Sequence, residues 1–336
     1  MRELVLDQNA ATGANKTATS ILLVQQDDGA IPWFTGGRID PWNHVEAAMA
    51  LAVAGERDAA RRAFRWLADC QREDGSWFAA YARDGSVLED HCDTNATAYV
   101  ATGLHLYCVV TGDREFVGEI FGVVERALEY VVLHVDERGM LPWSIGPGDA
   151  ISPHSLLAAS SSVVASLRSG AALSDGAGKP RPDWLDAASK IAIAIIEDEV
   201  AFLDKSAFSM DWYYPVLAGV LDRRRARERL AKGLSRFVIP GHGVRCRSDG
   251  SWVTAAESGE CAVACARAGF DRIARRILEC AEALRDEDGA FRTGVVHPDR
   301  SEFPDGERTT YSAAAMILAA DVLAGGPSAR VFSQLS

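Results

Sequence analysis

A helical pattern that recurs along the whole chain is the feature that most constrains its fold. Strongly apolar segments, typical of buried helices, occupy residues 40–54, 93–110, 155–173, 211–221, 254–268 and 308–323. Their starts lie about 54 residues apart, a spacing that fits one helical hairpin per repeat. Amphipathic segments at 56–70, 184–196, 223–237 and 271–283 would be outer helices, and no run alternates as a strand does. The sequence therefore predicts an all-α fold, a single α/α toroid in which six helical hairpins form an (α/α)6 barrel.

A recurrent turn joins these helices. Five segments combine polar residues, a glycine and a closing aromatic side chain: 26–33, 71–77, 136–143, 248–252 and 286–291. We expect each glycine to be able to adopt a positive φ and each aromatic side chain to close its turn against the core. The segment 173–183, with its Gly and Pro residues, is predicted to be a flexible insertion between hairpins. We therefore interpret residues 1–336 as one toroid domain.

The overall charge argues against some classes of partner. The chain has 35 Lys and Arg residues against 47 Asp and Glu residues, and its net charge of −12 has the wrong sign for binding nucleic-acid phosphates. No apolar run approaches the ~18 residues of a membrane span, and residues 1–16 lack the apolar stretch of a signal peptide. The seven cysteines form no CxxC pair, which favours reduced thiols. We expect a cytoplasmic protein with no nucleic-acid partner and no integral membrane association.

Polar residues gather near the starts of the apolar helices, and a toroid would bring these starts to one mouth. The candidate site residues are Asp40, Trp42, His44, Glu46, Asp93, Asn95, Asp211, Trp212, Tyr214, Glu257, Glu260, Arg308 and Tyr311. An ionised carboxylate that faces a core is costly unless it is paired, so the three glutamates favour a polar pocket. The aspartates at helix starts could instead be N-caps, and the tryptophans could staple turns rather than bind a ligand.

Paired carboxylates are suited to general acid–base catalysis, because burial can raise the pKa of one while a polar neighbour keeps the other ionised. We assign Asp93 or Asp211 as the proton donor and Glu257 as its carboxylate partner. His44 and Glu46 would orient these groups. The remaining candidate residues would bind the substrate.

Two further roles stay open at this point. Arg308 could be the counter-ion of a site carboxylate or a clamp on an anionic or hydroxyl-rich ligand. A zinc site would have to draw on His44, His91, Cys92, Asp93, Cys261 and Cys265. These residues lack a recognised ligand spacing, so we predict neither a metal nor another cofactor.

One turn carries a family resemblance. Residues 66–77, WLADCQREDGSW, resemble the QW motif of the terpenoid cyclase and protein prenyltransferase toroids, and residues 21–29 are a weaker copy. Segments such as DTNATAY and SMDWYYPVLAG are similar to actinobacterial proteins described as prenyltransferase-like. The resemblance implies cyclase or transferase chemistry on an isoprenoid-type small molecule, with Mg²⁺ where the substrate is a diphosphate. The DxDD motif of the cyclases is incomplete, because its central position falls on Cys92 between Asp90 and Asp93.

Two alternatives stay open beside this leading interpretation. The six-hairpin glycosidases, with related lyases and epimerases, have the same ring of helices and place carboxylates and aromatic residues at its mouth. The polar candidate residues fit an oligosaccharide better than a terpene, whose cavity would be mostly apolar. A toroid without catalytic activity that binds a glycan or a lipid is the third interpretation. The recurrent QW-like turn favours the terpenoid side.

Overall fold

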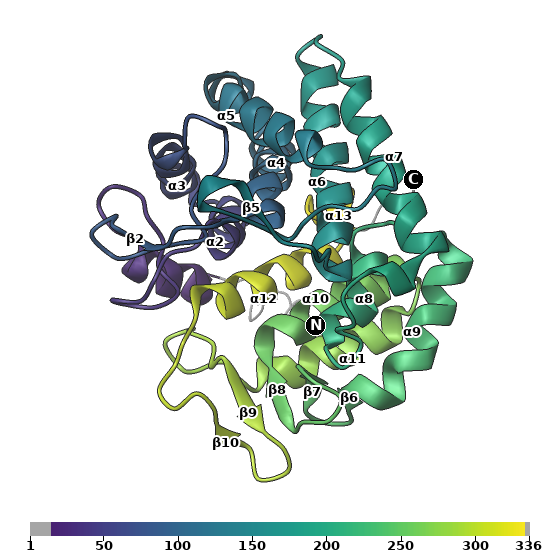
Figure 1. The fold of residues 1–336 in the computed structure, drawn as a ribbon. Helices are drawn as coiled ribbons and strands as arrows, with labels where there is room; N and C mark the ends of the chain where they lie inside the picture. Colours follow the sequence, from purple (N-terminus) through teal and green to yellow (C-terminus); the bar gives the residue numbers. More distant parts are fainter. Residues whose placement is uncertain (1–14, 333–336) are drawn as a thin grey trace.

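The computed structural model describes residues 15–332 and is mainly helical (Figure 1). Most of the segment used in the signal-peptide argument, residues 1–14, lies outside the described residues. A helical segment at 15–24 comes first. The helices that follow are α2 (Pro41–Val53), α3 (Arg57–Cys70), α4 (Thr94–Thr111), α5 (Arg114–Leu133), α6 (Leu157–Gly176), α7 (Pro182–Glu197), α8 (Ser209–Leu217), α9 (Arg223–Phe237), α10 (Ala255–Arg267), α11 (Asp271–Glu282), α12 (Thr310–Leu323) and α13 (Ala329–Phe332), with short 3-10 turns at Pro147–Asp149 and Glu199–Ala201.

The helices alternate between an inner and an outer position. The inner helices α2, α4, α6, α8, α10 and α12 contact one another in that order, and α12 also contacts α2. Helices α3, α5, α7 and α9 lie at the periphery (Figure 1). Each predicted apolar segment becomes an inner helix that begins within a turn of its expected start. The expectation of a mainly helical fold is therefore confirmed.

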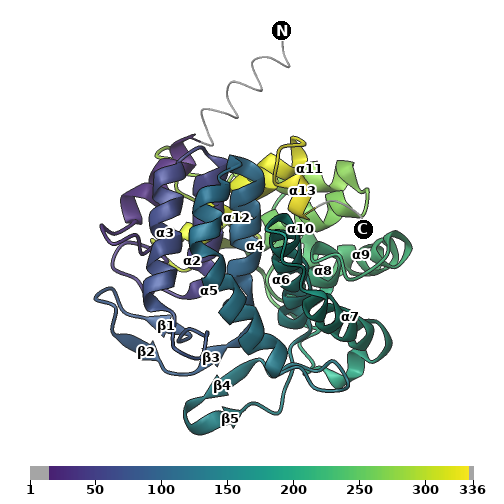
Figure 2. The ribbon, with the colours of Figure 1, turned by 90° about the horizontal axis from the view of Figure 1, so that it is seen from above.

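Short strands between the helices depart from the all-α expectation. They are β1 (Ala80–Tyr81), β2 (Val87–Glu89), β3 (Cys92–Asp93), β4 (Ser144–Gly146), β5 (Ala150–Ile151), β6 (Val238–Ile239), β7 (Gly243–Arg245), β8 (Trp252–Thr254), β9 (Gly294–Val296) and β10 (Ser301–Glu302). They pair antiparallel in three sheets, ordered β1-β2, β3-β4-β5 and β10-β9-β8-β7-β6. Strands of two or three residues are too short to show an alternating pattern, so the sequence could not indicate them. In Figure 2 β1–β5 lie at one end of the helices and α13 at the other.

The flexible insertion expected at 173–183 is mostly helical instead. Helix α6 continues to Gly176 and α7 begins at Pro182, so only residues 177–181 connect them. Proline fits the first turn of α7, where the missing N–H costs no hydrogen bond. The single-domain interpretation of the chain stays a prediction. No helix between residues 15 and 332 is both long and apolar enough to cross a membrane.

The QW-like turn fastens one outer helix to the next. Gly75 has a φ of 93°, and a Cβ at this position would lie 2.4 Å from the carbonyl oxygen of Arg126 on α5. The side-chain amide of Gln71 donates hydrogen bonds to the carbonyl oxygens of Gly75 and Val123, both at 2.9 Å. Trp77 is buried beneath the turn. The motif therefore serves packing between α3 and α5.

The same close approach recurs in three other copies of the turn. Gly29, Gly139 and Gly289 have φ values of 100°, 79° and 96°. A Cβ on any of them would come within 2.4 Å of the backbone of a helix at the periphery or of the helical segment 15–24. Gly250, in the remaining copy, does not have a positive φ. The expected glycine conformation thus holds in four of the five copies.

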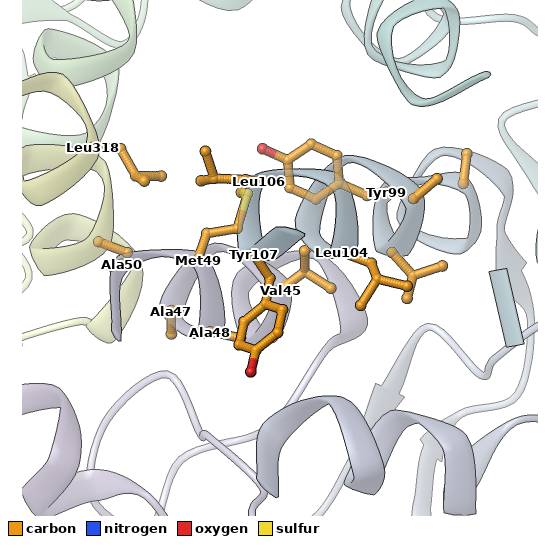
Figure 3. Packing of buried hydrophobic residues seen from close by; sticks show 14 of the residues in the cluster. Val45, Ala47, Ala48, Met49, Ala50, Tyr99, Leu104, Leu106, Tyr107 and Leu318 are labelled. Carbon is orange, nitrogen blue, oxygen red and sulfur yellow. The ribbon is translucent and has the colours of Figure 1, made fainter. Parts of the chain in front are cut away.

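The core lies among the inner helices and between them and the outer helices. Figure 3 shows Val45 and Met49 of α2 packed with Leu104 and Tyr107 of α4, with Leu318 of α12 to one side. Helices α2 and α4 approach closely, because a Cβ on Gly103 would lie 2.5 Å from Val45. Burying such apolar side chains contributes about 25 cal/mol per Å² and supports the inner helices that carry the polar residues described next.

Candidate active site

Three tyrosines surround one buried carboxylate on α10. Glu260 accepts hydrogen bonds from Tyr311 at 2.6 Å, from Tyr214 at 3.0 Å and from Tyr213. Burial raises the pKa of Glu260 to about 7, and the charge of Glu257 adds to the rise while the tyrosine hydroxyls oppose it. This carboxyl is therefore divided between its protonated and ionised forms near neutral pH.

A second buried carboxylate on α2 faces the first. Glu46 accepts a hydrogen bond from the Tyr99 hydroxyl, and its Oε2 has no partner within the described part of the chain. Burial, followed by the charge of Glu260, raises the pKa of Glu46 to about 8. The Tyr99 ring stacks on Trp42, with ring centroids 3.8 Å apart and planes inclined by 11°. The arrangement joins a protonated carboxyl to a stacked aromatic pair.

The third carboxylate lies one turn nearer the start of α10. Thr254 is the N-cap of this helix, and its Oγ1 accepts a hydrogen bond from the Glu257 backbone N–H at 3.3 Å. The Thr254 hydroxyl also donates to the Glu257 carboxylate. Burial raises the pKa of Glu257, and a hydrogen bond from Cys246 opposes that rise. Glu257 and Glu260, three residues apart, share one face of α10.

Two aspartates cap neighbouring inner helices. Asp40 accepts hydrogen bonds from the backbone N–H and the side-chain amide of Asn43, at 2.9 and 2.7 Å, and one from the Trp33 indole. Asp93 caps α4 by accepting from the backbone N–H of Ala96 at 2.9 Å. Burial raises the pKa of Asp93 to about 6, with a further contribution from the Asp40 charge. Both aspartates are N-caps, and burial also raises the pKa of Asp40.

Asp211 lies apart from this cluster. It sits in the first turn of α8 rather than at its cap, and it accepts a hydrogen bond from the Ala158 backbone N–H at 3.3 Å. Its charged neighbours are Arg229, Glu199 and Asp204, and burial raises its pKa to about 6. Asp211 lines a groove of about 790 Å³ between α7, α9 and the loop before α8.

Two of the expected site residues hold helices together instead. The Trp212 indole N–H donates to the carbonyl oxygen of Arg229 at 2.9 Å, and the ring stacks on Phe237, so it packs α8 against α9. His44 is fully buried, with its Nδ1 accepting from the Ile31 backbone N–H and its Nε2 bonded to the carbonyl oxygen of Ala63. Burial lowers the pKa of His44 to about 4. Both ring nitrogens are engaged with backbone, so His44 cannot orient the carboxylates.

Arg308 takes the counter-ion role, with partners other than those expected. Its guanidinium pairs with Asp286 in the loop after α11 and with Glu302 of β10. It therefore joins that loop to β10 and makes no hydrogen bond or ion pair with Glu257 or Glu260. Asn95 lies in the first turn of α4, and its Oδ1 is buried without a hydrogen-bond partner in the described part of the chain.

Several residues of the cluster are not among the candidates predicted from the sequence. They are Tyr99, Tyr213, Thr254, Cys246 and Asn43. The segment 254–257, TAAE, has the spacing of a capping box, and this signal could have identified Thr254. Tyr99 and Tyr213 give no such signal, because the glutamates that they contact lie on other helices, far away in the sequence. Among residues 15–332 no group of three or more His, Cys, Asp or Glu side chains could hold a metal ion.

Comparisons with known proteins overturn the leading interpretation. No protein-family model matches the chain. It is 42% identical over 308 residues to an MMP endo-(1,4)-3-O-methyl-α-D-mannosidase from Mycolicibacterium hassiacum, a match that covers 92% of this chain and 85% of that enzyme. The expected isoprenoid substrate with cyclase or transferase chemistry is therefore wrong, as is the assignment to the terpenoid superfamily. The QW-like turn misled because it serves helix packing.

Solved structures agree on the fold. A glycosidase superposes with a TM-score of 0.74 at 16% identity, covering 94% of this chain and 97% of that one. A GH63 mannosylglycerate hydrolase from Thermus thermophilus, in complex with glucose, gives 0.72 at 13% identity over 90% of this chain and 98% of that one. A D-mannose isomerase gives 0.71 at 11% identity over 93% and 97%. With the mannosidase sequence match, these likenesses support the alternative interpretation: the chain belongs to the family of the 3-O-methyl-mannosidase, and it has the fold of these solved glycosidase and isomerase structures.

Proposed function

We propose that this protein is an endo-acting glycoside hydrolase that cleaves α-(1,4) bonds in chains of 3-O-methylmannose. The observation that carries the proposal is the 42% identity to an MMP endo-(1,4)-3-O-methyl-α-D-mannosidase across 92% of this chain. A site rich in buried carboxylates supports it, because glycoside hydrolysis uses a pair of carboxyl groups.

We also propose that the inner helices form a closed (α/α)6 ring. Contacts of α12 with α2 support closure. So does the Thr310 backbone N–H at the start of α12, which donates to the carbonyl oxygen of Trp33 at 2.7 Å, just before α2. In such a ring two inner helices separate α4 from α10 on either side, so the starts of α4 and α10 lie across the mouth from each other.

Asp93 and Glu257 are the proposed reacting pair. They lie at the starts of α4 and α10, which the proposed ring would set on opposite sides of its mouth. Asp93, with a pKa raised to about 6, retains a proton in part of the population and would donate it to the glycosidic oxygen. The Glu257 carboxyl group, in its ionised form, would act on the other face of the sugar. It would act on a water or on the anomeric carbon itself, according to the separation of the two carboxyl groups. Asp211 lies apart from the other candidate carboxyl groups, beside Arg229, Glu199 and Asp204. We therefore choose Asp93 as the donor.

The remaining cluster would bind and position the substrate. The Trp42–Tyr99 stack offers an apolar surface for sugar rings and their methyl groups. Glu46 and Glu260 would fix the hydroxyls of Tyr99, Tyr214 and Tyr311 through the hydrogen bonds described above. Asp40 and Asn95, at the same mouth, would contribute polar contacts.

The function is tested by incubating the purified protein with an α-(1,4)-linked 3-O-methylmannose oligosaccharide and separating the products by mass spectrometry. We expect internal cleavage into shorter oligosaccharides. The matched control is the α-(1,4)-mannose oligosaccharide of the same length without methyl groups, which should be cleaved more slowly. Cleavage of neither chain would contradict the proposed function, and faster cleavage of the unmethylated chain would contradict the proposed specificity.

A further inference from the structure

A second cavity lies at the α13 end of the inner helices, on the far side of the tyrosines. Its volume is about 160 Å³, and residues of α4, α6, α8, α10 and α13 line it. Tyr99 and Tyr214, which bond the active-site glutamates, form one wall. Arg330 and Phe332 of α13 form another, at the end opposite β1–β5 (Figure 2). The cavity is thus separate from the carboxylate cluster and independent of the function proposed above.

Arginines face this cavity without acidic partners. Arg168, Arg267 and Arg330 line it, and none of its described lining residues is acidic. Arg267 is only 9% exposed; its Nη1 donates to the carbonyl oxygen of Phe332 at 2.8 Å, and its Nε has no partner in the described structure. Arg168 donates to the carbonyl oxygen of Gly219 at 2.8 Å. Burial and the charge of Arg168 lower the pKa of Arg267 to about 10, so it remains a cation at neutral pH.

Two other partly buried arginines, in contrast, are paired with carboxylates. Arg61 pairs with Asp113, and Arg229 with Glu199. Burying a charge without a counter-ion is costly, so two such cations beside one cavity indicate that an anion completes the site. The chain has a net charge of −12, yet this cavity is lined by arginines and by no carboxylate of the described residues. This contrast strengthens the case for a bound anion.

The rest of the lining suits an oxyanion. The hydroxyls of Thr102, Ser162 and Ser169 come from α4 and α6, and these small side chains leave room beside the guanidinium groups. His105 also lines the cavity, and its Nδ1 is buried without a partner in the part of the chain described. Guanidinium groups match the geometry of planar and tetrahedral oxyanions through paired N–H donors. The volume is roughly ten times what one water needs, which leaves room for an ion of several atoms.

We propose that this cavity is a binding site for a small oxyanion of the phosphate or sulfate class, held by Arg168 and Arg267 and closed by Arg330. Bound there, the anion neutralises the buried cations and joins α6, α10 and α13. It stabilises the folded chain in proportion to its concentration, because the unfolded chain has no such site.

The test is isothermal titration calorimetry of inorganic phosphate, and separately of sulfate, into the whole protein in a chloride buffer. Saturable binding with one site per chain is expected for the wild type. Arg168→Gln should weaken binding about tenfold or more, since it removes a charged hydrogen-bond donor. Arg276→Gln, which removes an exposed arginine of α11, is the matched control and should leave the dissociation constant within about twofold.

A second variant guards against misfolding. Arg330 is exposed, so Arg330→Gln should fold normally and weaken phosphate binding by about threefold to tenfold. Thermal melting in increasing phosphate should raise the Tm of the wild type and of Arg276→Gln, and raise that of Arg168→Gln less. Absence of saturable binding of both anions to the wild type, or unchanged affinity in both Arg168→Gln and Arg330→Gln, would overturn the proposal. Glycan cleavage is not a readout of this experiment, so its result stands apart from the test of the proposed function.

Discussion

The two ends of the inner helices carry opposite charges. At the strand end, Glu257 and Asp93 lie at helix N-termini, beside a buried cluster of carboxylates and tyrosines. At the α13 end, Arg168 and Arg267 face a cavity with no acidic lining residue among those described. The helix macrodipole favours anions at N-termini and cations at C-termini, which fits Asp93, Glu257 and Arg267 in the last turn of α10, whereas Arg168 lies in the middle of α6. One set of helices can therefore hold acid–base groups at one end and an anion site at the other.

The largest expected difference between the two ends is in catalysis. Asp93→Asn removes the proposed proton donor and should lower the rate of glycan cleavage about 100- to 10,000-fold while the protein stays folded. Initial rates at saturating substrate measure the effect, and circular dichroism checks the fold. The matched control is Asp211→Asn, which changes a carboxyl in a different environment and should cost less than about tenfold. A larger loss in Asp211→Asn than in Asp93→Asn would reverse the assignment of the donor.

The two ends should also differ in how stability depends on pH. The pKa of Glu46 is raised from 4.5 to about 8 in the folded protein, so the folded state keeps a proton that the unfolded chain loses. This contribution to stability is complete below pH 4.5 and is lost as the pH rises through about 8. Glu46→Gln keeps the neutral form at every pH. It should therefore lose less stability than the wild type between pH 5 and pH 8, by on the order of 2 kcal/mol.

Urea unfolding at several pH values measures this slope. Arg168→Gln is the control at the other end, because an arginine keeps its charge across this window and should leave the slope unchanged. Equal slopes in the wild type and Glu46→Gln would show that Glu46 is ionised in the folded protein and would contradict the raised pKa.

A smaller effect is expected from a single hydroxyl at the acidic end. Tyr99→Phe removes the hydrogen bond to Glu46 but keeps the stack on Trp42. We expect a loss of about 1 kcal/mol in the free energy of unfolding. The pKa of Glu46 should rise further, because the lost hydrogen bond favours the ionised form. If Tyr99→Phe is more stable than the wild type, or if the pKa of Glu46 falls in this variant, the hydrogen bond between Tyr99 and Glu46 is contradicted.

The smallest effect is predicted for the rate of glycan cleavage by Arg168→Gln, a variant at the α13 end. Arg168→Gln should change the rate of glycan cleavage by less than about threefold, since Tyr99 and Tyr214 separate the cavity from the proposed reacting pair. The same assay as for Asp93→Asn measures it, with Arg276→Gln as the surface control. A tenfold loss would mean that the two ends act as one site.

The sequence predicted the acidic end better than the basic one, for a physical reason. Glu46, Glu257 and Glu260 stand out as charges inside apolar helices, and the structure brings these three glutamates together. His44 stood out in the same way, but a buried imidazole can be satisfied by backbone, and the contacts with Ile31 and Ala63 join separate segments of the chain. Periodicity carries no information about such partners.

The basic cavity could not have been predicted. Arg168 and Arg267 lie on α6 and α10, and at most sequence positions an arginine is a solvated surface residue. Only the packing of α13 against the other helices shows that these two are enclosed. The family assignment failed for a related reason. The QW-like turn packs one outer helix against the next, and a packing contact carries no information about the substrate.

If Glu257 acts with Asp93 on a 3-O-methylmannose chain, the formation of new reducing ends depends on Glu257, and proton NMR detects those ends. Anomeric signals of new reducing ends are followed in an α-(1,4)-3-O-methylmannose oligosaccharide with the wild type and with Glu257→Gln. We predict new signals with the wild type, and with the variant at least about 100-fold fewer per unit time, while the variant still binds the oligosaccharide. Cleavage by Glu257→Gln at the wild-type rate would show that Glu257 is not one of the two reacting carboxyl groups.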